Sequence, residues 1–430
     1  MRIVDLLRAA VLAAAASALA SSPIAAQAEN WPGWRGPRGD GSSHEAGVPT
    51  VWNGETGQNI AWKTAIPGTG HSSPVVWGDR IFVVACITGK GADAGDRVLF
   101  CLDRTSGSVL WQQTVLQAPL EKKHALNSHA SGTPATDGEL VYVAFLEPDF
   151  ASLKERTPGE MVVAAYDVQG RKRWEARPGR FASVHGFCTS PVLFEDKVIV
   201  NGDHDGDGYL VALARSDGRE LWRVARPNNT RSYVTPIIRD LAGRTQLIFS
   251  GSKCVASYDP RTGQQLWLMD GPTEQFVASL VDDGQFVYLT AGFPEKHILA
   301  LRPDGQGRVG DEQIVWRTQR NCSYVPSPVI CGDYFLIASD EGIASCYHAR
   351  SGKLQWTARL GKHYSASLVT AGGLVYFLAD DGLMKVVRPG PKLEVVAENP
   401  LGEYCYASPA ISQGQIFLRG EKHLVCIGTK

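Results

Sequence analysis

The chain has 430 residues, of which 44% are hydrophobic and 20% charged, with 45 Gly, 24 Pro and 11 Trp. This composition is typical of a globular protein, and the length permits one large domain or two to three ordinary ones. The formal net charge of −1 leaves no basic excess. We therefore expect neither nucleic acid nor an anionic membrane surface as the partner.

Residues 1–28 are predicted to be a cleaved secretory signal peptide. A basic start precedes an Ala-rich apolar run over 9–20, and the AQA at 26–28 is a small-x-small cleavage site. The run is shorter than the roughly 20 residues that a bilayer requires, and no later stretch could span one. No Cys precedes Cys86, which excludes a lipid-modified amino-terminal Cys. We expect a soluble periplasmic or secreted protein that is not a lipoprotein.

The segment 29–52 is predicted to be an irregular lead-in, because it is rich in Gly, Pro and Trp. We expect it to pack over an outer surface of the following domain. The stretch NIAWKTAIP at 59–67 then alternates in side-chain type and ends at a Pro, which predicts a strand with Trp62 at its centre. This strand has no partner strand upstream.

A repeat follows this strand. Its copies open with a small or hydroxyl residue, usually a Pro, and a short apolar run, and most continue through a Gly, Asp or Asn turn into an alternating strand. These openings are SSPVVWGD (72–79), SGTPATDG (131–138), TSPVLFED (189–196), VTPIIRD (234–240), VASLVDDG (277–284), PSPVICGD (326–333), SASLVTAG (365–372) and ASPAISQG (407–414).

A third strand, a Gly turn and a Trp strand complete most copies, as in VLFCLDRTSGSVLW, which ends at Trp111. The spacing of roughly 40 to 60 residues is that of four-stranded propeller blades. A large flat side chain on the outer strand would fill the wedge between neighbouring blades, burying on the order of 200 Å². We assign this packing role, and no ligand, to Trp111, Trp174, Trp222, Trp267, Trp316 and Trp356.

The last copy ends after three predicted strands and lacks the Gly turn and the Trp strand. NGETGQNIAW at 53–62 supplies both missing features, a Gly turn followed by a Trp strand. An open ring would leave two exposed sheet edges, which favour mispairing. The sequence therefore predicts one all-β domain over 53–430, an eight-bladed propeller of four-stranded antiparallel blades whose last blade is closed by the amino-terminal strand.

The Trp strands DRTSGSVLW (103–111) and DPRTGQQLW (259–267) resemble the tryptophan-docking repeats of pyrroloquinoline-quinone (PQQ) type propellers. The resemblance covers nearly all of the chain after residue 28 and implies eight blades. It places the chain near two branches, the quinoprotein dehydrogenases and the propeller subunit of the outer-membrane barrel assembly machine. Fold does not carry function across these branches.

This chain departs from both branches. It lacks the adjacent Cys pair of quinoprotein alcohol dehydrogenases and is shorter than they are, and it lacks the Cys of the lipoprotein subunit. It is similar instead to exported PQQ-like propeller proteins. The nine Cys form no CxxC motif. Most are expected to be buried apolar residues, although an oxidising compartment permits a pair such as Cys331 with Cys346.

Polar and aromatic residues precede each innermost strand and are expected to converge on one mouth of the central channel. Such a ring offers hydrogen-bond donors, aromatic faces and one fixed charge to a polar or anionic ligand. The alternative is that these groups cap strand ends around a water-filled channel. A further alternative is a metal bound by three of the His. The candidate residues are His71, His129, His185, Arg231, Tyr233, Gln275, Tyr324, His363, Tyr364 and Tyr406.

Two further motifs match known sites in part. NGDHDGDGYL places Asp203, Asp205 and Asp207 in the front half of a calcium loop, but Ala214 occupies the position of the closing Glu, and a hairpin turn is the alternative. GQGRVG at 305–310 matches a dinucleotide motif in letters only, because no helix follows it.

These observations predict an exported, monomeric binding or scaffold propeller without chemistry of its own, whose partner is a protein or a small polar ligand. One alternative is a PQQ-dependent oxidoreductase, which would require PQQ and calcium at the axis. The other is a subunit of outer-membrane protein assembly.

Overall fold

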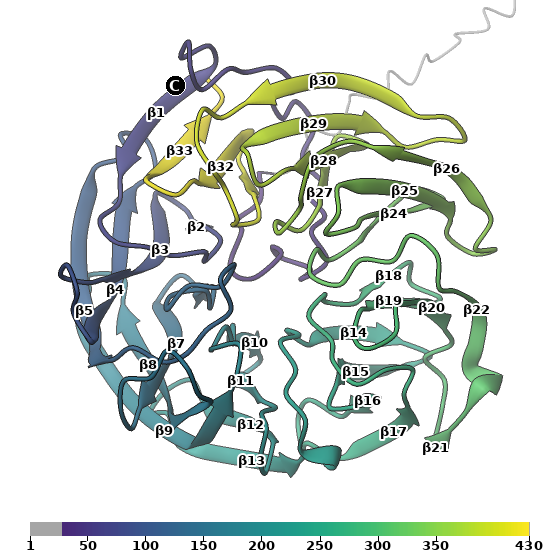
Figure 1. The fold of residues 1–430 in the computed structure, drawn as a ribbon, viewed down its shortest axis with the longest axis horizontal. Coiled ribbons are helices and arrows are strands. Elements are labelled where there is room, and N and C mark those ends of the chain that lie inside the picture. Colours follow the sequence, from purple (N-terminus) through teal and green to yellow (C-terminus); the bar gives the residue numbers. More distant parts are fainter. Residues whose placement is uncertain (1–27, 430) are drawn as a thin grey trace, which may run out of the picture.

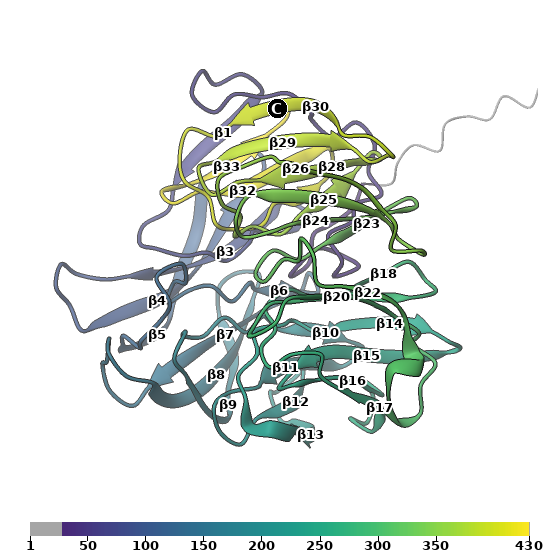
Figure 2. The ribbon, with the colours of Figure 1, turned by 45° about the vertical axis from the view of Figure 1, so that its right-hand side comes forward.

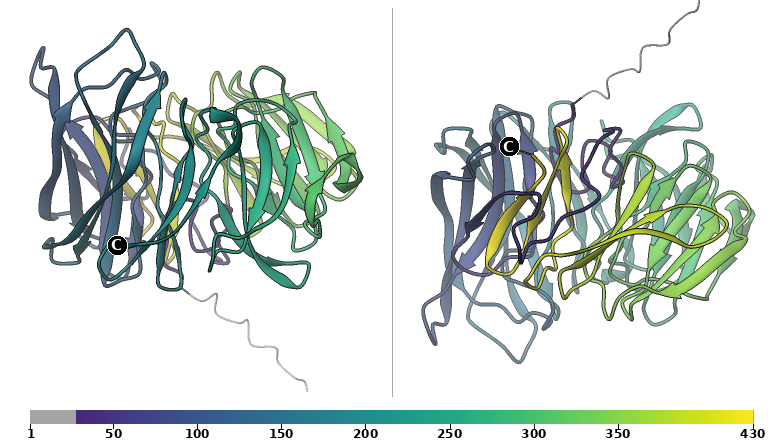
Figure 3. Two further views of the ribbon diagram at one scale, coloured as in Figure 1. Left: turned by 90° about the horizontal axis from the view of Figure 1, so that it is seen from below. Right: turned by 90° about the horizontal axis from the view of Figure 1, so that it is seen from above.

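Eight β-sheets surround a central axis in the computed structural model, which describes residues 28–429 (Figure 1). The predicted all-β, eight-bladed propeller is therefore confirmed. All but the last residue of the predicted signal peptide lies outside the described residues. Edge-on views show a disc with the strands crossing its thickness (Figure 3).

The first four blades follow the chain in order, each strand antiparallel to the one before it. Blade 1 comprises β2 (Val75–Trp77), β3 (Arg80–Ile87), β4 (Ala94–Asp103) and β5 (Val109–Pro119). Blade 2 comprises β6 (Ala135–Thr136), β7 (Leu140–Pro148), β8 (Thr157–Asp167) and β9 (Lys172–Ser183). Blade 3 comprises β10 (Val192–Phe194), β11 (Lys197–Gly202), β12 (Tyr209–Ala214) and β13 (Glu220–Ala225). Blade 4 comprises β14 (Ile237–Leu241), β15 (Arg244–Gly251), β16 (Cys254–Tyr258) and β17 (Gln265–Asp270).

The remaining blades complete the ring. Blade 5 comprises β18 (Val281–Asp282), β19 (Val287–Ala291), β20 (His297–Leu301) and β22 (Ile314–Thr318). Blade 6 comprises β23 (Val329–Cys331), β24 (Tyr334–Ala338), β25 (Ile343–His348) and β26 (Leu354–Arg359). Blade 7 comprises β27 (Val369–Ala371), β28 (Leu374–Leu378), β29 (Leu383–Arg388) and β30 (Glu394–Pro400). Blade 8 comprises β31 (Ala410–Ser412), β32 (Gln415–Arg419), β33 (His423–Ile427) and β1 (Ile60–Ala65).

Blade 8 is closed by the amino-terminal strand, as predicted. β1 pairs antiparallel with β33, with Trp62 opposite Cys426 and Thr64 opposite Leu424. Figure 2 shows β1 beside β32 and β33 from a second direction. The first and last strands of the described chain therefore share one sheet, in which β1 pairs with the edge of β33 that would otherwise be exposed.

Blade 4 departs from the four-stranded pattern. Residues Gly307–Val309 form β21, a short strand that pairs in parallel with β17. This strand contains three of the six residues of the GQGRVG stretch, which lies against a sheet and is not a dinucleotide loop. The helical elements of residues 28–429 are two short turns, η1 (Pro227–Asn229) and η2 (Asp311–Gln313). Within this part of the chain, no helix has the length and apolar character needed to cross a membrane.

Tryptophans on the outer strands join neighbouring blades. Nε1 of six indoles donates a hydrogen bond to a backbone carbonyl of the next blade, and five of these rings, all but that of Trp356, also pack against a Gly turn there. The bonds run from Trp62 to Arg104 (2.8 Å), Trp111 to Val168 (3.0 Å), Trp174 to Arg215 (2.8 Å), Trp222 to Pro260 (3.1 Å), Trp316 to Ala349 (2.6 Å) and Trp356 to Gly390 (3.1 Å).

Trp267 is the exception in this set. Its Nε1 donates to Oε1 of Gln246 within its own blade, at 2.9 Å, because β21 covers the outer edge of β17. The hydrogen bonds of Trp111, Trp174, Trp222, Trp316 and Trp356 to the next blade agree with the packing role predicted for these residues.

The nine Cys are free thiols in the described chain, so Cys331 and Cys346 form no disulfide. Seven of them are buried. Burial also raises the pKa of Cys346 to about 12 and that of Cys426 to about 12, which keeps both thiols protonated at neutral pH.

Candidate functional site

A cavity of about 550 Å³ lies on the axis at one mouth of the channel, and we call it the cup. The segments that precede the innermost strands supply most of its wall. Eight of the predicted residues line it together: His71, His185, Arg231, Tyr233, Gln275, Tyr324, His363 and Tyr406. They come from seven blades, which the ring closure brings within one cavity.

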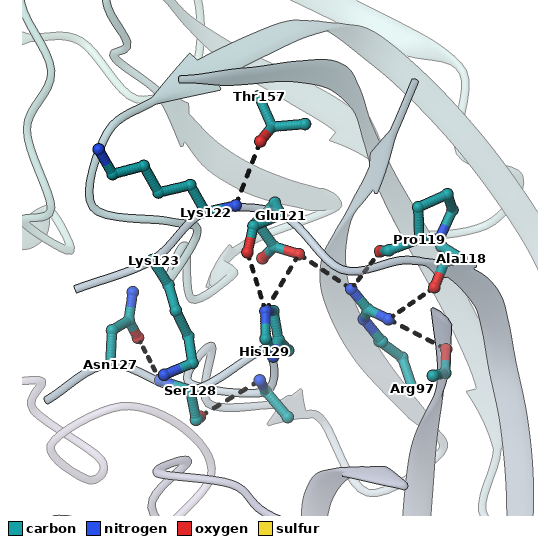
Figure 4. A network of polar contacts seen from close by, with 12 residues as sticks. Arg97, Ala118, Pro119, Glu121, Lys122, Lys123, Asn127, Ser128, His129 and Thr157 are labelled. Atoms are coloured by element: carbon teal, nitrogen blue, oxygen red, sulfur yellow. Dashed lines mark hydrogen bonds and ion pairs between the residues drawn. The ribbon is translucent and has the colours of Figure 1, made fainter. Parts of the chain in front are cut away.

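His129 does not line the cup. Its Nε2 lies 3.0 Å from the carbonyl oxygen of Glu121, and its side chain is only 10% exposed. Glu121 in turn forms a buried ion pair with Arg97 at 2.9 Å, and Arg97 also donates to the carbonyls of Ala118 and Pro119 (Figure 4). His129 therefore helps to hold the loop between β5 and β6 on blade 1.

Tyr364 also lies outside the cup. Its side chain is fully buried between blades 6 and 7, with its ring centroid 6.4 Å from that of Phe377. The hydroxyl has no hydrogen-bond partner within the described residues. His363, the residue before Tyr364, does line the cup. The two side chains differ because adjacent residues of an extended chain face opposite ways.

The floor of the cup is Trp34 of the lead-in. Its Nε1 donates to Oγ of Ser279 on blade 5 at 3.0 Å. Trp31 of the same segment pairs through its backbone with Val76 on β2, and Ser42 pairs with Thr370 on β27. Figure 1 shows this purple segment crossing the centre of the ring. The lead-in thus closes one end of the channel.

The expectation that the lead-in packs over an outer surface is wrong. The reason is Arg35, whose side chain is almost fully buried. Its guanidinium donates to the carbonyls of Pro328 (2.5 Å), Ser327 (3.4 Å) and Leu368 (3.3 Å), which lie at the inner ends of blades 6 and 7. Arg35 of the lead-in therefore joins the inner ends of two neighbouring blades.

A collar of hydroxyls surrounds the axis between the cup and the innermost strands. The backbone N–H of one blade donates to the Ser or Thr hydroxyl of the next, which fixes the spacing of the segments that carry the cup residues. The links are Ser73 to Thr133 (3.0 Å), Thr133 to Ser190 (2.9 Å), Ser279 to Ser327 (2.9 Å), Ser327 to Ser367 (3.0 Å), Ser367 to Ser408 (2.9 Å) and Ser408 to Ser73 (3.1 Å).

His71 and His185 present neutral rings to the cup. Burial lowers the pKa of His71 to about 4, and burial followed by the charge of Arg231 lowers the pKa of His185. Nδ1 of His71 lies 3.1 Å from the carbonyl oxygen of Leu126. A carbonyl oxygen can only accept, so Nδ1 carries the proton and Nε2 is left as an acceptor.

The tyrosines of the cup are protonated donors or acceptors. Burial raises the pKa of Tyr324 to about 12, and burial also raises that of Tyr233. The hydroxyl of Tyr324 donates to Oε1 of Gln275 at 3.2 Å, and that of Tyr233 lies 2.9 Å from Nδ1 of His185. These pairs hold the polar atoms of the wall in place.

The charges of the cup are balanced. Arg231, the one Arg or Lys among its lining residues in the described chain, donates from Nη1 to Asp205 at 2.7 Å. Asp340 is engaged by the backbone N–H groups of Tyr324 (2.9 Å) and Val325 (3.0 Å). The cup therefore offers an anionic ligand no cation that is free of a carboxylate.

The predicted calcium loop is occupied by internal partners. Asp203 is buried and forms an ion pair with Arg226 at 3.0 Å, Asp205 pairs with Arg231, and Asp207 is exposed. Across residues 28–429, no three His, Cys, Asp or Glu side chains come together as a metal site. Neither the Asp motif nor the three His therefore forms a cluster that could hold a metal within these residues.

Calcium-bound PQQ does not fit the residues of the cup. The quinone carries several carboxylates, which call for unpaired cations, but Arg231 is neutralised by Asp205. Calcium requires six to eight oxygen ligands. The one carboxylate that lines the cup, Asp340, already accepts two backbone N–H groups.

Several lining residues carried no sequence signal. Trp34 lies in the lead-in, outside the repeat, while His124 and Asn127 lie in the long loop between β5 and β6. Asp340 follows β24 at a turn. The hydroxyl collar was visible as the Ser or Thr in the repeat openings, but its hydrogen bonds link different blades and could not be read from one copy.

A family model described as "Outer membrane protein assembly factor BamB" matches residues 43–157, 94–292 and 295–388. A search of curated protein sequences found no match to this chain. Among solved structures, BamB from Moraxella catarrhalis has a TM-score of 0.57 at 11% identity, covering 86% of this chain and 99% of its own.

Two dehydrogenases share the same architecture. The quinohemoprotein alcohol dehydrogenase from Comamonas testosteroni has a TM-score of 0.65 at 12% identity, covering 94% of this chain and 82% of its own. A europium-containing methanol dehydrogenase has a TM-score of 0.52 at 13% identity, covering 92% and 90%. At these identities the likeness extends to the fold alone.

Proposed function

This chain belongs to the repeat family described as the outer membrane protein assembly factor BamB, and on that premise we propose that it is an exported binding propeller without chemistry of its own. Its ligand is a small, neutral, polyhydroxylated molecule, which binds in the cup. The predicted leader at residues 1–28 supports export to the periplasm or beyond.

The observation that carries this proposal is the closed floor of the cup. A ring alone would leave an open channel, but Trp34 and the lead-in close one end and leave a cavity of about 550 Å³. This volume lies within the range of small-molecule sites, which are typically about 300 to 1,000 Å³.

The chemistry of the lining favours a neutral polyhydroxylated ligand. Trp34, Tyr324 and Tyr406 offer aromatic faces, against which the apolar face of a sugar ring packs. Gln275 and the neutral His71 offer fixed donors and acceptors at the wall. An anionic ligand is disfavoured because the charge of Arg231 is already balanced by Asp205.

Isothermal titration calorimetry against neutral mono- and disaccharides tests the proposal, with inorganic phosphate and PQQ with calcium as competing probes. We expect a neutral sugar to bind and Tyr406→Ala to weaken it about tenfold. Tyr404→Ala is the matched control, since Tyr404 stacks on Tyr406 with ring centroids 6.5 Å apart but is 56% exposed and outside the cup. Binding of phosphate or PQQ in place of sugars would contradict the proposed ligand class.

Outer-membrane protein assembly is a second candidate, favoured by the description of the family. In that role the propeller would be a scaffold that binds a protein partner. Affinity purification of the tagged protein from membranes of its own host tests it. Recovery of a barrel-assembly component supports this role, and purification without one counts against it.

A further inference from the structure

A buried carboxylate, that of Glu45, lies where the lead-in meets blade 8. The residue is 3% exposed. Its Oε1 accepts the backbone N–H groups of Glu29 (2.7 Å) and Gln413 (2.5 Å), and its Oε2 accepts that of Gly414 (2.5 Å). Within the described residues, Glu45 forms no ion pair with a side chain. A buried charge without a counter-charge is costly, even where hydrogen bonds satisfy it.

The neighbouring cations are engaged elsewhere. Arg104 of blade 1 donates to Oε1 of Gln413 at 2.6 Å. Arg38 forms a bidentate pair with the side chain of Glu29 at 2.7 and 2.9 Å, and His44 lies 3.9 Å from the same carboxylate. The group that reaches Glu45 from the lead-in is therefore the backbone nitrogen of Glu29.

Cleavage of the signal peptide during export would turn this backbone nitrogen into a free amino group. The predicted cleavage site, AQA at 26–28, ends at the bond between Ala28 and Glu29. Ala28 is exposed, whereas Glu29 is half-buried and anchored, because its carbonyl accepts a hydrogen bond from Oγ of Ser412 at 2.6 Å. The enclosed part of the chain thus begins at the residue after the predicted scissile bond.

We propose that signal-peptide cleavage completes the propeller by creating the counter-charge of Glu45. Hydrolysis of the Ala28–Glu29 bond consumes one water and leaves a carboxylate on Ala28 and an α-ammonium on Glu29. The amide nitrogen that would become this ammonium lies 2.7 Å from Oε1 of Glu45, so an ion pair would replace an ordinary amide hydrogen bond. The usual pKa of an α-amino group, about 7.7 to 8.0, is raised by an adjacent carboxylate, which keeps it charged at neutral pH.

The consequence is a link between maturation and the cup. Residues 29–45 include Trp34 and Arg35, which close the floor, and Glu45 joins the start and end of this segment to blade 8. The uncleaved chain has an amide at this position, which cannot carry the charge. The new amino terminus therefore fastens the floor only in the mature protein.

The inference rests on the export that we propose. Two measurements test the export processing and the ion pair separately. Intact-mass analysis of protein exported with its own leader is expected to give a chain that begins at Glu29. A retained leader, or a chain that begins elsewhere, would overturn both export processing at this site and the ion pair.

Thermal melting then tests the ion pair itself, using chains released from a fusion partner. A chain that begins at Glu29 is compared with one that begins at Gln27. We expect the first to melt at least about 2 °C higher at pH 7. Glu45→Gln should abolish this difference, whereas Glu55→Gln, at an exposed position, should preserve it.

The pH dependence distinguishes charge from steric effects of the added residues. A group whose pKa is raised on folding stabilises the folded state below its unfolded pKa, and this stability is lost as the pH rises through its folded pKa. The advantage of the Glu29 form should therefore shrink between about pH 8 and pH 11. The neighbouring cationic side chains, Arg38, His44 and Arg104, are present in both forms, so they are matched in this comparison. Equal melting temperatures at pH 7, or a difference that survives Glu45→Gln, would overturn the inference.

Discussion

Trp62 and Gly107 join the two ends of the ring. A Cβ atom built on Gly107 would lie 2.5 Å from the indole of Trp62, and the backbone of Gly107 has a φ of +71°. The glycine accepts this backbone conformation and admits the flat ring, while Nε1 of Trp62 donates to the carbonyl of Arg104 at 2.8 Å. Trp62 belongs to blade 8 and Gly107 to blade 1, so this contact is the seam of the propeller.

Gly107→Ala should destabilise the protein more than the same change at a comparable turn. Gly78 has a φ of +54° but no heavy atom within 4 Å of its Cβ position, so Gly78→Ala tests backbone strain alone. We expect a loss of about 1 kcal/mol at Gly78 and about 1 to 3 kcal/mol more at Gly107, where the methyl group meets the indole. Urea unfolding measures both. Equal losses would show that the seam contact does not contribute.

Deleting residues 53–67 should abolish cooperative melting, because it exposes the edge of β33 and removes the contact that Trp62 of blade 8 makes with blade 1. Differential scanning calorimetry and size-exclusion chromatography report the change. A synthetic peptide of 53–67 added in trans should restore a sharp transition, whereas a scrambled peptide should not. A truncated chain that melts like the intact one would contradict closure through β1.

His71 should make the ligand-free protein less stable in mild acid. Burial lowers its pKa to about 4 in the folded state, while the unfolded ring titrates near 6.5. The unfolded state therefore binds more protons between these values, and stability is full above about pH 6.5 and falls as the pH drops toward 4.

Melting temperatures measured between pH 7 and pH 4 check this sign. His71→Gln should flatten the loss. His124→Gln is the matched control, since this ring is exposed at the same mouth. An unchanged slope in His71→Gln would show that another group causes the acid sensitivity.

Arg35→Lys should loosen the floor of the cup even though the charge is kept. One ammonium cannot reproduce the fork that donates to carbonyls of Ser327, Pro328 and Leu368. We expect a loss of about 2 to 4 kcal/mol in urea unfolding. Arg171→Lys, at a side chain that is 72% exposed, should change stability by about 0.5 kcal/mol or less. A tolerated Arg35→Lys would contradict the anchoring role.

The cup could be predicted in part. The residues before each innermost strand converge because a ring places equivalent positions of every repeat around one axis, and eight of the ten candidates line the cavity. His129 does not line it, because its ring contacts the buried Glu121. Tyr364 does not line it, because adjacent residues of an extended chain face opposite ways.

The sequence by itself determined the blades, their number and the closure by the first strand. These follow from local alternation, from turn residues and from a repeat that ends one strand short. Only the tertiary structure decided how the channel ends. Arg35, Trp34 and Glu45 lie in a segment without repeat or periodicity, and their partners lie hundreds of residues away in blades 5 to 8. Such contacts depend on which carbonyls and amides remain unpaired at the centre of the finished ring, and no local pattern encodes them.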